Sequence, residues 1–211
     1  MTSSVTEFQI MIVKATDYAV ISDKASVFSE IFKPETQIAI WSDQMCRMAQ
    51  HYAESFKDLH PHFSIKQMLT PDSMPQYLDS VLKSGQGRAE LIQSVSTLAE
   101  MFCYLFEQES LGFRMHLLDR AMCPRFHRDY VPCRLVMTLR GASTHWLDEE
   151  SASLALSEDS YDGAFNSLDA GDIALLKGAG WFGNEAKGLV HRSPSIDQGD
   201  WRLFLSMDFA N

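Results

Sequence analysis

His127 and Asp129 are the residues best suited to chemistry in this sequence. They lie two positions apart in CPRFHRDYVPCRLVMTLR, which runs from Cys123 to Arg140. Side chains two positions apart on a strand point to the same side. An imidazole and a carboxylate projecting together are two ligands of the 2-His-1-carboxylate site, which holds non-haem Fe(II) and leaves positions open. The pair predicts a metal site, with a hydrogen-bonded pair at a strand end as the plainer alternative.

The best candidate for the third ligand is His191, in the segment GLVHRSP. It lies 64 residues beyond His127, which is enough chain to form several antiparallel strands and return beside the first. We therefore predict that His127, Asp129 and His191 together bind one metal ion.

Two cysteines offer an alternative set of ligands. Cys123 and Cys133 flank the pair as C-x3-H-x-D-x3-C. Zn(II) prefers cysteine and histidine in a tetrahedral array. Strand alternation gives Cys133 the same parity as His127, although Pro132 can break the strand and reset that count. Liganding by either cysteine would favour zinc over iron.

The other histidines fit structural roles better. His60 and His62 flank a proline in a loop with no third ligand nearby, which predicts surface histidines. His116 and His145 lie within or beside apolar strand segments, which predicts side chains in the core or at its rim.

The residues that carry these side chains are predicted to form strands. From Leu111 onward the chain has short segments that alternate or are continuously apolar, separated by Gly, Asp and Ser. We predict strands at 111–118, 124–129, 133–140, 144–147, 153–156, 164–168, 172–177, 188–192 and 201–209. Such a series without helical spacing indicates an antiparallel sandwich or barrel of the jelly-roll type.

The first half of the chain has mainly helical spacing. Apolar residues recur every three or four positions at about 42–58, 73–85 and 89–107, while 33–41 resembles a strand and 5–22 a hairpin or two edge strands. The expected fold class is α+β. A mainly helical region, 1–110, is expected to pack on a β barrel, 111–211, as one compact unit whose helices buttress one sheet.

Composition excludes several kinds of partner. The 211 residues are 45% hydrophobic and 22% charged, with a net charge of −10 at pH 7. That charge disfavours nucleic acid and membrane surfaces, and no run approaches the roughly 18 apolar residues of a membrane span. The first residues, MTSSVTEFQIMIVKATDY, lack an export signal, so we expect a cytoplasmic protein with reduced cysteines.

The C-terminal half resembles a known superfamily. AGDIALLKG opens on a Gly-Asp turn into an apolar strand, the glycine-rich GAGWFGNEAKG follows, and VHRSP comes next. This order, after the HxD motif, resembles the double-stranded β-helix of the Fe(II)/2-oxoglutarate oxygenases, over about 90 residues from Cys123 to Phe209. The resemblance implies a cupin-like barrel with Fe(II) and 2-oxoglutarate as cofactors.

The oxygenases also carry an Arg or Lys about ten residues after the distal histidine. Arg202 stands eleven residues after His191, and its planar fork suits the far carboxylate of 2-oxoglutarate. The oxygenases commonly place a hydroxyl residue two positions further, where this chain has Phe204, and Ser206 follows on the same strand face. Arg202 and Ser206 are thus the predicted co-substrate residues. The structural alternative for Arg202 is a salt bridge, with Asp200 and Asp208 as partners.

The whole chain more closely resembles a bacterial family known as domain of unknown function 1826. The resemblance rests on CPRFHRD, RLVMTLRG, LLKG, GN, HRSP and RLFLSMDF. It implies no mechanism, although members of that family look to be linked with zinc homeostasis. We therefore expect a metal-dependent oxygenase of the Fe(II)/2-oxoglutarate type acting on a small molecule or a protein. The alternatives are a non-enzymatic cupin-like protein that binds Zn(II) alone, and a barrel without metal.

Overall fold

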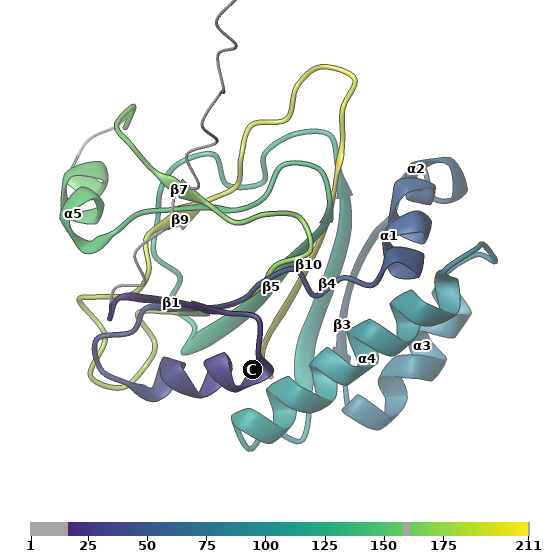
Figure 1. Cartoon of the computed structure of the whole chain (residues 1–211), viewed down its shortest axis with the longest axis horizontal. Helices are drawn as coiled ribbons and strands as arrows, with labels where there is room; N and C mark the ends of the chain where they lie inside the picture. The colour runs from purple at the N-terminus through teal and green to yellow at the C-terminus, as the bar shows by residue number, and fades with distance from the viewer. Residues whose placement is uncertain (1–16, 158–160, 211) are drawn as a thin grey trace, which may run out of the picture.

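The computed structural model describes residues 17–157 and 161–210. Two β-sheets and a layer of helices make up these residues (Figure 1). Most of the strand segment predicted at 5–22 lies outside the described residues, and its last part forms strand β1 (Ala19–Ser22).

The larger sheet has seven strands. In spatial order they are β1, β2 (Ile38–Trp41), β8 (Ile173–Lys177), β5 (Cys133–Arg140), β10 (Arg202–Phe209), β4 (Leu111–Leu118) and β3 (Ser64–Leu69). β1 and β2 are parallel, and every other neighbouring pair is antiparallel. β10 therefore lies in the interior of the sheet, with both edges hydrogen-bonded.

The smaller sheet consists of β7 (Asn166–Ser167), β6 (His145–Trp146) and β9 (His191–Arg192), all antiparallel. A core of apolar side chains lies between the two sheets: Ala19, Ile38, Ile40, Val136, Trp146, Leu168, Ala174, Leu176 and Leu189. Helix α5 (Glu149–Ser157) packs on the other side of the smaller sheet, against Leu147 and Val190. We call the face of the larger sheet that carries Val136 and Ala174 its inner face.

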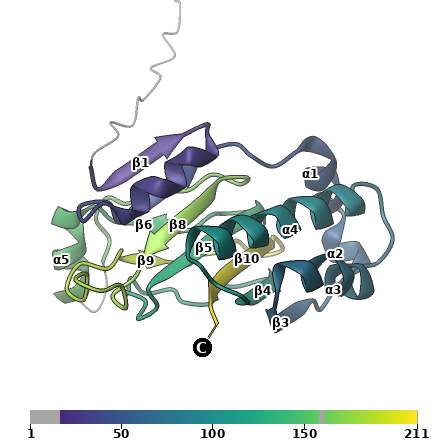
Figure 2. The ribbon, with the colours of Figure 1, turned by 90° about the horizontal axis from the view of Figure 1, so that it is seen from below.

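The remaining helices cover the outer face of the larger sheet. They are the 3-10 segments η1 (Ala25–Phe32) and η2 (Pro71–Ser73), and helices α1 (Arg47–Glu54), α2 (Phe56–Leu59), α3 (Met74–Val81) and α4 (Arg88–Leu105) (Figure 2). Leu203, Leu205 and Met207 of β10 join the core beneath them. Because strand neighbours alternate, Arg202 and Phe204 face the other way. No helix within the described ranges is long and apolar enough to cross a membrane.

The first half of the chain is less helical than predicted. It contributes β1, β2 and β3 to the larger sheet, so that sheet draws strands from both sides of residue 110. β3 was missed because it is an edge strand with mostly exposed side chains, and only Leu69 of its six residues is buried. An edge strand with so few buried residues lacks the apolar alternation that predicts strands.

Three further element predictions were wrong in detail. The segment 153–156 lies in helix α5, because Ala152 and Ala155 are both buried and their three-residue spacing is helical. The segment 124–129 is not a strand and makes a single β-bridge at His127. The helix predicted at 42–58 begins at Arg47 and divides at Ser55 into α1 and α2.

His60 is buried, contrary to the prediction of a surface residue, whereas His62 is exposed. The His60 ring stacks on Phe56 with 4.6 Å between ring centroids. Its Nε2 accepts a hydrogen bond from the backbone N–H of Lys83 at 3.1 Å. Burial, with a smaller contribution from the Lys83 charge, lowers the pKa of His60. His60 therefore joins α2 to the end of α3.

Candidate metal centre

His127 and His191 are direct partners in the backbone. Each backbone N–H donates to the other residue's carbonyl, and both distances are 3.0 Å. The two residues therefore lie opposite one another, and their rings are 4.7 Å apart between centroids. A β-bridge thus brings together two histidines that are far apart in the sequence.

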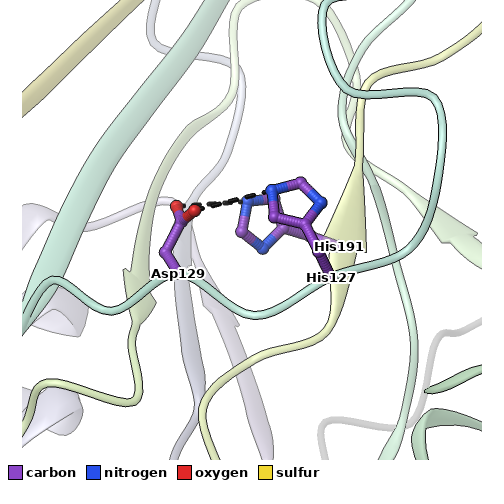
Figure 3. Close-up of side chains that lie close together, drawn as sticks. All are labelled: His127, Asp129 and His191. Atoms are coloured by element: carbon purple, nitrogen blue, oxygen red, sulfur yellow. Dashed lines mark ion pairs between the residues drawn. The ribbon is translucent and has the colours of Figure 1, made fainter.

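Asp129 completes a group of three possible metal ligands (Figure 3). Its Oδ1 lies 3.5 Å from Nε2 of His127, and its Oδ2 lies 3.4 Å from Nε2 of His191. One ligand atom from each residue lies within 4.8 Å of the others. The structure therefore brings the three predicted ligands together.

The hydrogen bonds of the two imidazoles determine their tautomers. Nδ1 of His127 is 3.0 Å from the carbonyl oxygen of Arg125, and Nδ1 of His191 is 3.2 Å from that of Leu189. A carbonyl oxygen only accepts, so Nδ1 must carry the proton in each ring. In the neutral rings both Nε2 atoms then keep a free lone pair. This is the arrangement in which histidine ligates a metal.

The carboxylate of Asp129 is held in its charged form. Burial raises its pKa, but the contacts with His127 and His191 and the Arg134 guanidinium outweigh that effect and keep the pKa well below its usual value. The Asp129 carboxylate in turn raises the pKa of His127, because it accepts a hydrogen bond from Nε2 of the protonated ring, and burial opposes this effect. Arg134 contacts Asp129 on one side and Asp208 on the other.

The glycine-rich loop that follows β8 positions the backbone of Asp129. The backbone N–H of Ala179 donates to the carbonyl of Asp129 at 2.7 Å, and that of Gly180 donates to the carbonyl of Val131 at 3.2 Å. A Cβ on Gly180 would lie 2.3 Å from the carbonyl oxygen of Tyr130. Only glycine allows so close an approach. The composition of this loop thus follows from its packing against the metal-ligand segment.

Arg202 is almost fully buried on the inner face of β10, at 1% exposure. Its Nε and Nη2 donate to the hydroxyl of Thr138 at 3.3 and 3.0 Å, and Nη2 also donates to Thr144 at 2.9 Å. In the described part of the chain, Nη1 has no hydrogen-bond partner. The Phe204 ring lies 4.3 Å from the guanidinium carbon.

No carboxylate among the described residues compensates the charge of Arg202. The two carboxylates considered as salt-bridge partners pair elsewhere, Asp208 with Arg114 and Arg134, and Asp200 with Arg140. Burial lowers the pKa of Arg202 to about 10. The salt-bridge alternative for Arg202 is therefore wrong within the described structure.

A pocket of about 70 Å³ opens beside the two imidazoles. His127, His191, Thr144 and Phe204 line it, so it extends from the proposed ligands to two residues that contact Arg202. Ser206 is also buried, but it lies four residues beyond Arg202 along β10. At roughly 3.3 Å per residue that separation is about 13 Å.

The two cysteines have different environments. Cys133 is fully buried in the core beneath the helices, on the face of β5 opposite the inner face, because the chain irregularity at Pro132 resets the strand alternation. Cys123 is exposed and lines the pocket beside His127. Neither belongs to the group of three ligand atoms.

His116 and His145 also lie outside that group, as predicted for rim histidines. Both are partly buried, and burial lowers the pKa of each. His116 is hydrogen-bonded to Ser64, and the ring of His145 stacks on Phe165.

Three residues around the site were not recognised from the sequence. Thr138 and Arg134 occupy alternate positions of CRLVMTLR, where polar side chains interrupt an otherwise apolar strand. That interruption was the available signal for a polar inner face. Thr144 lies in the loop before β6 and gave no comparable signal.

Two solved structures share this fold. The chain is similar to AtDAO1, the dioxygenase for auxin oxidation 1 from Arabidopsis thaliana in complex with 2-oxoglutarate, at 9% identity and a TM-score of 0.58, covering 92% of each chain. It is also similar to JOX2 in complex with 2OG, Fe and JA, at 7% identity and a TM-score of 0.51, covering 90% of this chain and 73% of that one. The fold is therefore a double-stranded β-helix with added helices.

The sequence matches a protein-family model. No curated protein matches the sequence. A family model described as a protein of unknown function (DUF1826) covers residues 22–208. The chain therefore belongs to the DUF1826 family.

Proposed function

We propose that this protein is an Fe(II)- and 2-oxoglutarate-dependent oxygenase. The observation that carries the proposal is the buried Arg202, whose charge no described carboxylate compensates, in the same barrel as a group of two histidines and one aspartate. A buried unpaired charge is costly unless a ligand of opposite charge joins it. The far carboxylate of 2-oxoglutarate is such a ligand.

The donor set fits iron better than zinc. His127, Asp129 and His191 would hold the metal through two imidazole nitrogens and one carboxylate, and this facial set leaves positions for further ligands. No thiolate joins it, whereas structural zinc sites are usually closed by cysteine or histidine. When bound, Fe(II) and 2-oxoglutarate would supply the oxidising chemistry that transfers oxygen from O2 to a substrate.

Arg202 would bind the carboxylate that is not at the metal. Thr138 and Thr144 orient its guanidinium by accepting from Nε and Nη2, which leaves Nη1 for the ligand. We assign to these two hydroxyls the role expected of Ser206, which lies four residues beyond Arg202 along β10.

Phe204 would have to move when 2-oxoglutarate binds. The pocket of about 70 Å³ has room for two or three waters at roughly 30 Å³ each, and a five-carbon dicarboxylate is larger. Phe204 lines the pocket and stacks on Arg202. A change of its rotamer would join the space beside the imidazoles to the guanidinium.

Calorimetric titration of 2-oxoglutarate into the Mn(II)-loaded protein without O2 tests the proposal. Arg202→Ala should keep its metal but lose about 2 kcal/mol of 2-oxoglutarate binding, the scale of a charge-assisted hydrogen bond. Arg202→Lys should give an intermediate affinity, because lysine keeps the charge but not the planar fork. Arg88→Lys, in α4 and paired with Asp79, is the matched control and should bind as the wild type does.

Activity provides the second measurement. With Fe(II) and O2, the wild type should convert 2-oxoglutarate to succinate. If the wild type binds zinc tightly and shows no affinity for 2-oxoglutarate, the oxygenase proposal is wrong and a zinc-binding role replaces it.

A further inference from the structure

The larger sheet extends beyond the smaller one. The core between the sheets contains residues of β1, β2, β5 and β8 and none of β3 or β4. Register places Lys66 opposite Arg114, and Arg114 opposite Ser206, so all three lie on the inner face. In the described structure, the core between the sheets therefore does not extend over the inner face of β3 and β4.

A cavity of about 470 Å³ lies beside this part of the larger sheet. Its lining residues include charged and apolar ones: Lys66, Met68, Arg114, Val131 and Asp208. We call this surface the basic shelf. Met68 is 47% exposed there, so the shelf offers apolar contact area beside its charges.

The charges on the basic shelf do not balance. Like charges directly opposite on paired strands destabilise a sheet, and Lys66 faces Arg114 in this way. Asp208 pairs with both Arg114 and Arg134, and Arg134 also pairs with Asp129, so these two guanidinium groups face two carboxylates. Lys66 has no carboxylate within ion-pair distance in the described ranges. A positive excess therefore remains, although the chain carries a net charge of −10.

The basic shelf adjoins the candidate metal centre. Arg134 contacts the proposed ligand Asp129 and the shelf residue Asp208 with the same guanidinium. Val131, two residues after Asp129, lines the cavity. Arg134 therefore connects a residue of the shelf to a residue of the metal centre.

We infer that the basic shelf binds a carboxylate group of the primary substrate, a small carboxylic acid with an apolar body. This inference rests on the proposed oxygenase function for the reaction that follows binding. A carboxylate is planar and accepts in two directions, which matches the guanidinium fork of Arg114 with the Lys66 ammonium beside it. Met68 and Val131 would contact the apolar part, and the rest of the molecule would extend past Arg134 toward the metal.

NMR titration of the ¹⁵N-labelled protein with benzoate, and separately with the neutral benzamide, tests the inference. Benzoate should shift the amides of β3, β4 and the last residues of β10, and benzamide should bind more weakly at the same place. Lys66→Gln should weaken benzoate binding by about tenfold, the effect of losing a charge-assisted contact. Lys66 is exposed and has no ion-pair partner in the described structure, so this variant should fold.

Lys24→Gln is the matched control, because Lys24 is an exposed lysine before η1, far from the shelf in sequence and sheet order. The inference is wrong if the two substitutions weaken benzoate binding equally. It is also wrong if benzamide binds as tightly as benzoate, or if benzoate does not bind. Tighter binding of inorganic phosphate than of benzoate would overturn the assignment to carboxylates. The titration uses neither metal nor 2-oxoglutarate, so its outcome is independent of whether 2-oxoglutarate binds.

Discussion

At the scale of single residues, neighbouring groups orient the three side chains of the candidate metal centre. Backbone carbonyls hold Nδ1 of His127 and His191, so both Nε2 atoms face the carboxylate of Asp129. Arg134 holds that carboxylate in turn. Ligands oriented by such surrounding groups bind metal with little reorganisation.

The first prediction follows from this arrangement. His127→Ala, Asp129→Ala and His191→Ala should each abolish stoichiometric binding of Mn(II) or Fe(II), measured by calorimetry and by metal analysis. The far-UV circular dichroism should stay near that of the wild type, because His127 and Asp129 lie in a loop and His191 begins a two-residue strand.

Two controls accompany these variants. His62→Ala removes an exposed histidine outside the centre, and Cys123→Ser removes the thiol that lines the pocket. Both should keep full metal occupancy. Full occupancy in any of the three ligand variants would remove that residue from the ligand set, and loss of metal in Cys123→Ser would point to a thiolate ligand.

At the scale of elements, the glycine-rich loop after β8 positions the backbone of the segment that carries Asp129. Its backbone N–H groups donate to the carbonyls of Asp129 and Val131. Gly178 and Gly180 allow the loop and the ligand segment to lie in direct contact. A side chain at either glycine would push the segments apart.

Gly180→Ala should therefore lower the metal affinity by about tenfold, which is the usual effect of changing a group that orients a metal ligand. Gly183→Asn is the control in the same loop, because a Cβ at Gly183 meets nothing within 4 Å and asparagine tolerates its positive φ of 78°. Calorimetry with Mn(II) measures both variants. If Gly180→Ala binds Mn(II) as tightly as the wild type does, the loop does not position Asp129.

His60 makes the packing of the helices depend on pH. Its folded-state pKa lies below the unfolded value of about 6.5, so the folded protein favours the neutral ring. The stability from neutral His60 is complete above that unfolded value. As the pH falls below it, the unfolded chain binds a proton that the folded ring resists, and the free energy of unfolding declines.

Urea unfolding at about pH 7.5 and about pH 5.5 measures this effect. His60→Gln should be less stable than the wild type at the higher pH but should lose less stability on acidification. The exposed His62→Gln should follow the wild type at both pH values. An unchanged pH dependence in His60→Gln would assign the acid sensitivity to other groups.

At the scale of the whole molecule, β10 joins the helix layer to the barrel interior. It hydrogen-bonds to β4 and β5, packs Leu203, Leu205 and Met207 under the helices, and presents Arg202 to the inner face. The same strand therefore serves stability on one face and the candidate site on the other.

Leu205→Ala should destabilise the protein by about 2–5 kcal/mol, because the residue is fully buried and truncation leaves a cavity. Leu154→Ala in α5, at 52% exposure, should change the free energy of unfolding by much less. Urea unfolding gives both values. A loss below about 1 kcal/mol in Leu205→Ala would show that the core collapses around the missing side chain.

The sequence by itself determined which three side chains form the candidate metal centre. The two-residue spacing of His127 and Asp129 and the distance to His191 were enough to predict that these side chains lie together. The role of Arg202 stays a prediction. Most strands of the second half and helices α3 and α4 also follow from their apolar spacing. These features are local, and periodicity and motif spacing report local features well.

Only the tertiary structure decided which side chains are neighbours. Cys133 left the site because the chain turns at Pro132, and Arg202 lacks a carboxylate because Asp208 and Asp200 pair with other arginines. β3 and the basic shelf exist because an edge strand pairs with β4 across about fifty residues of sequence. The physical reason is that strand pairing and ion pairing depend on contacts between distant segments, which the spacing within one segment does not specify.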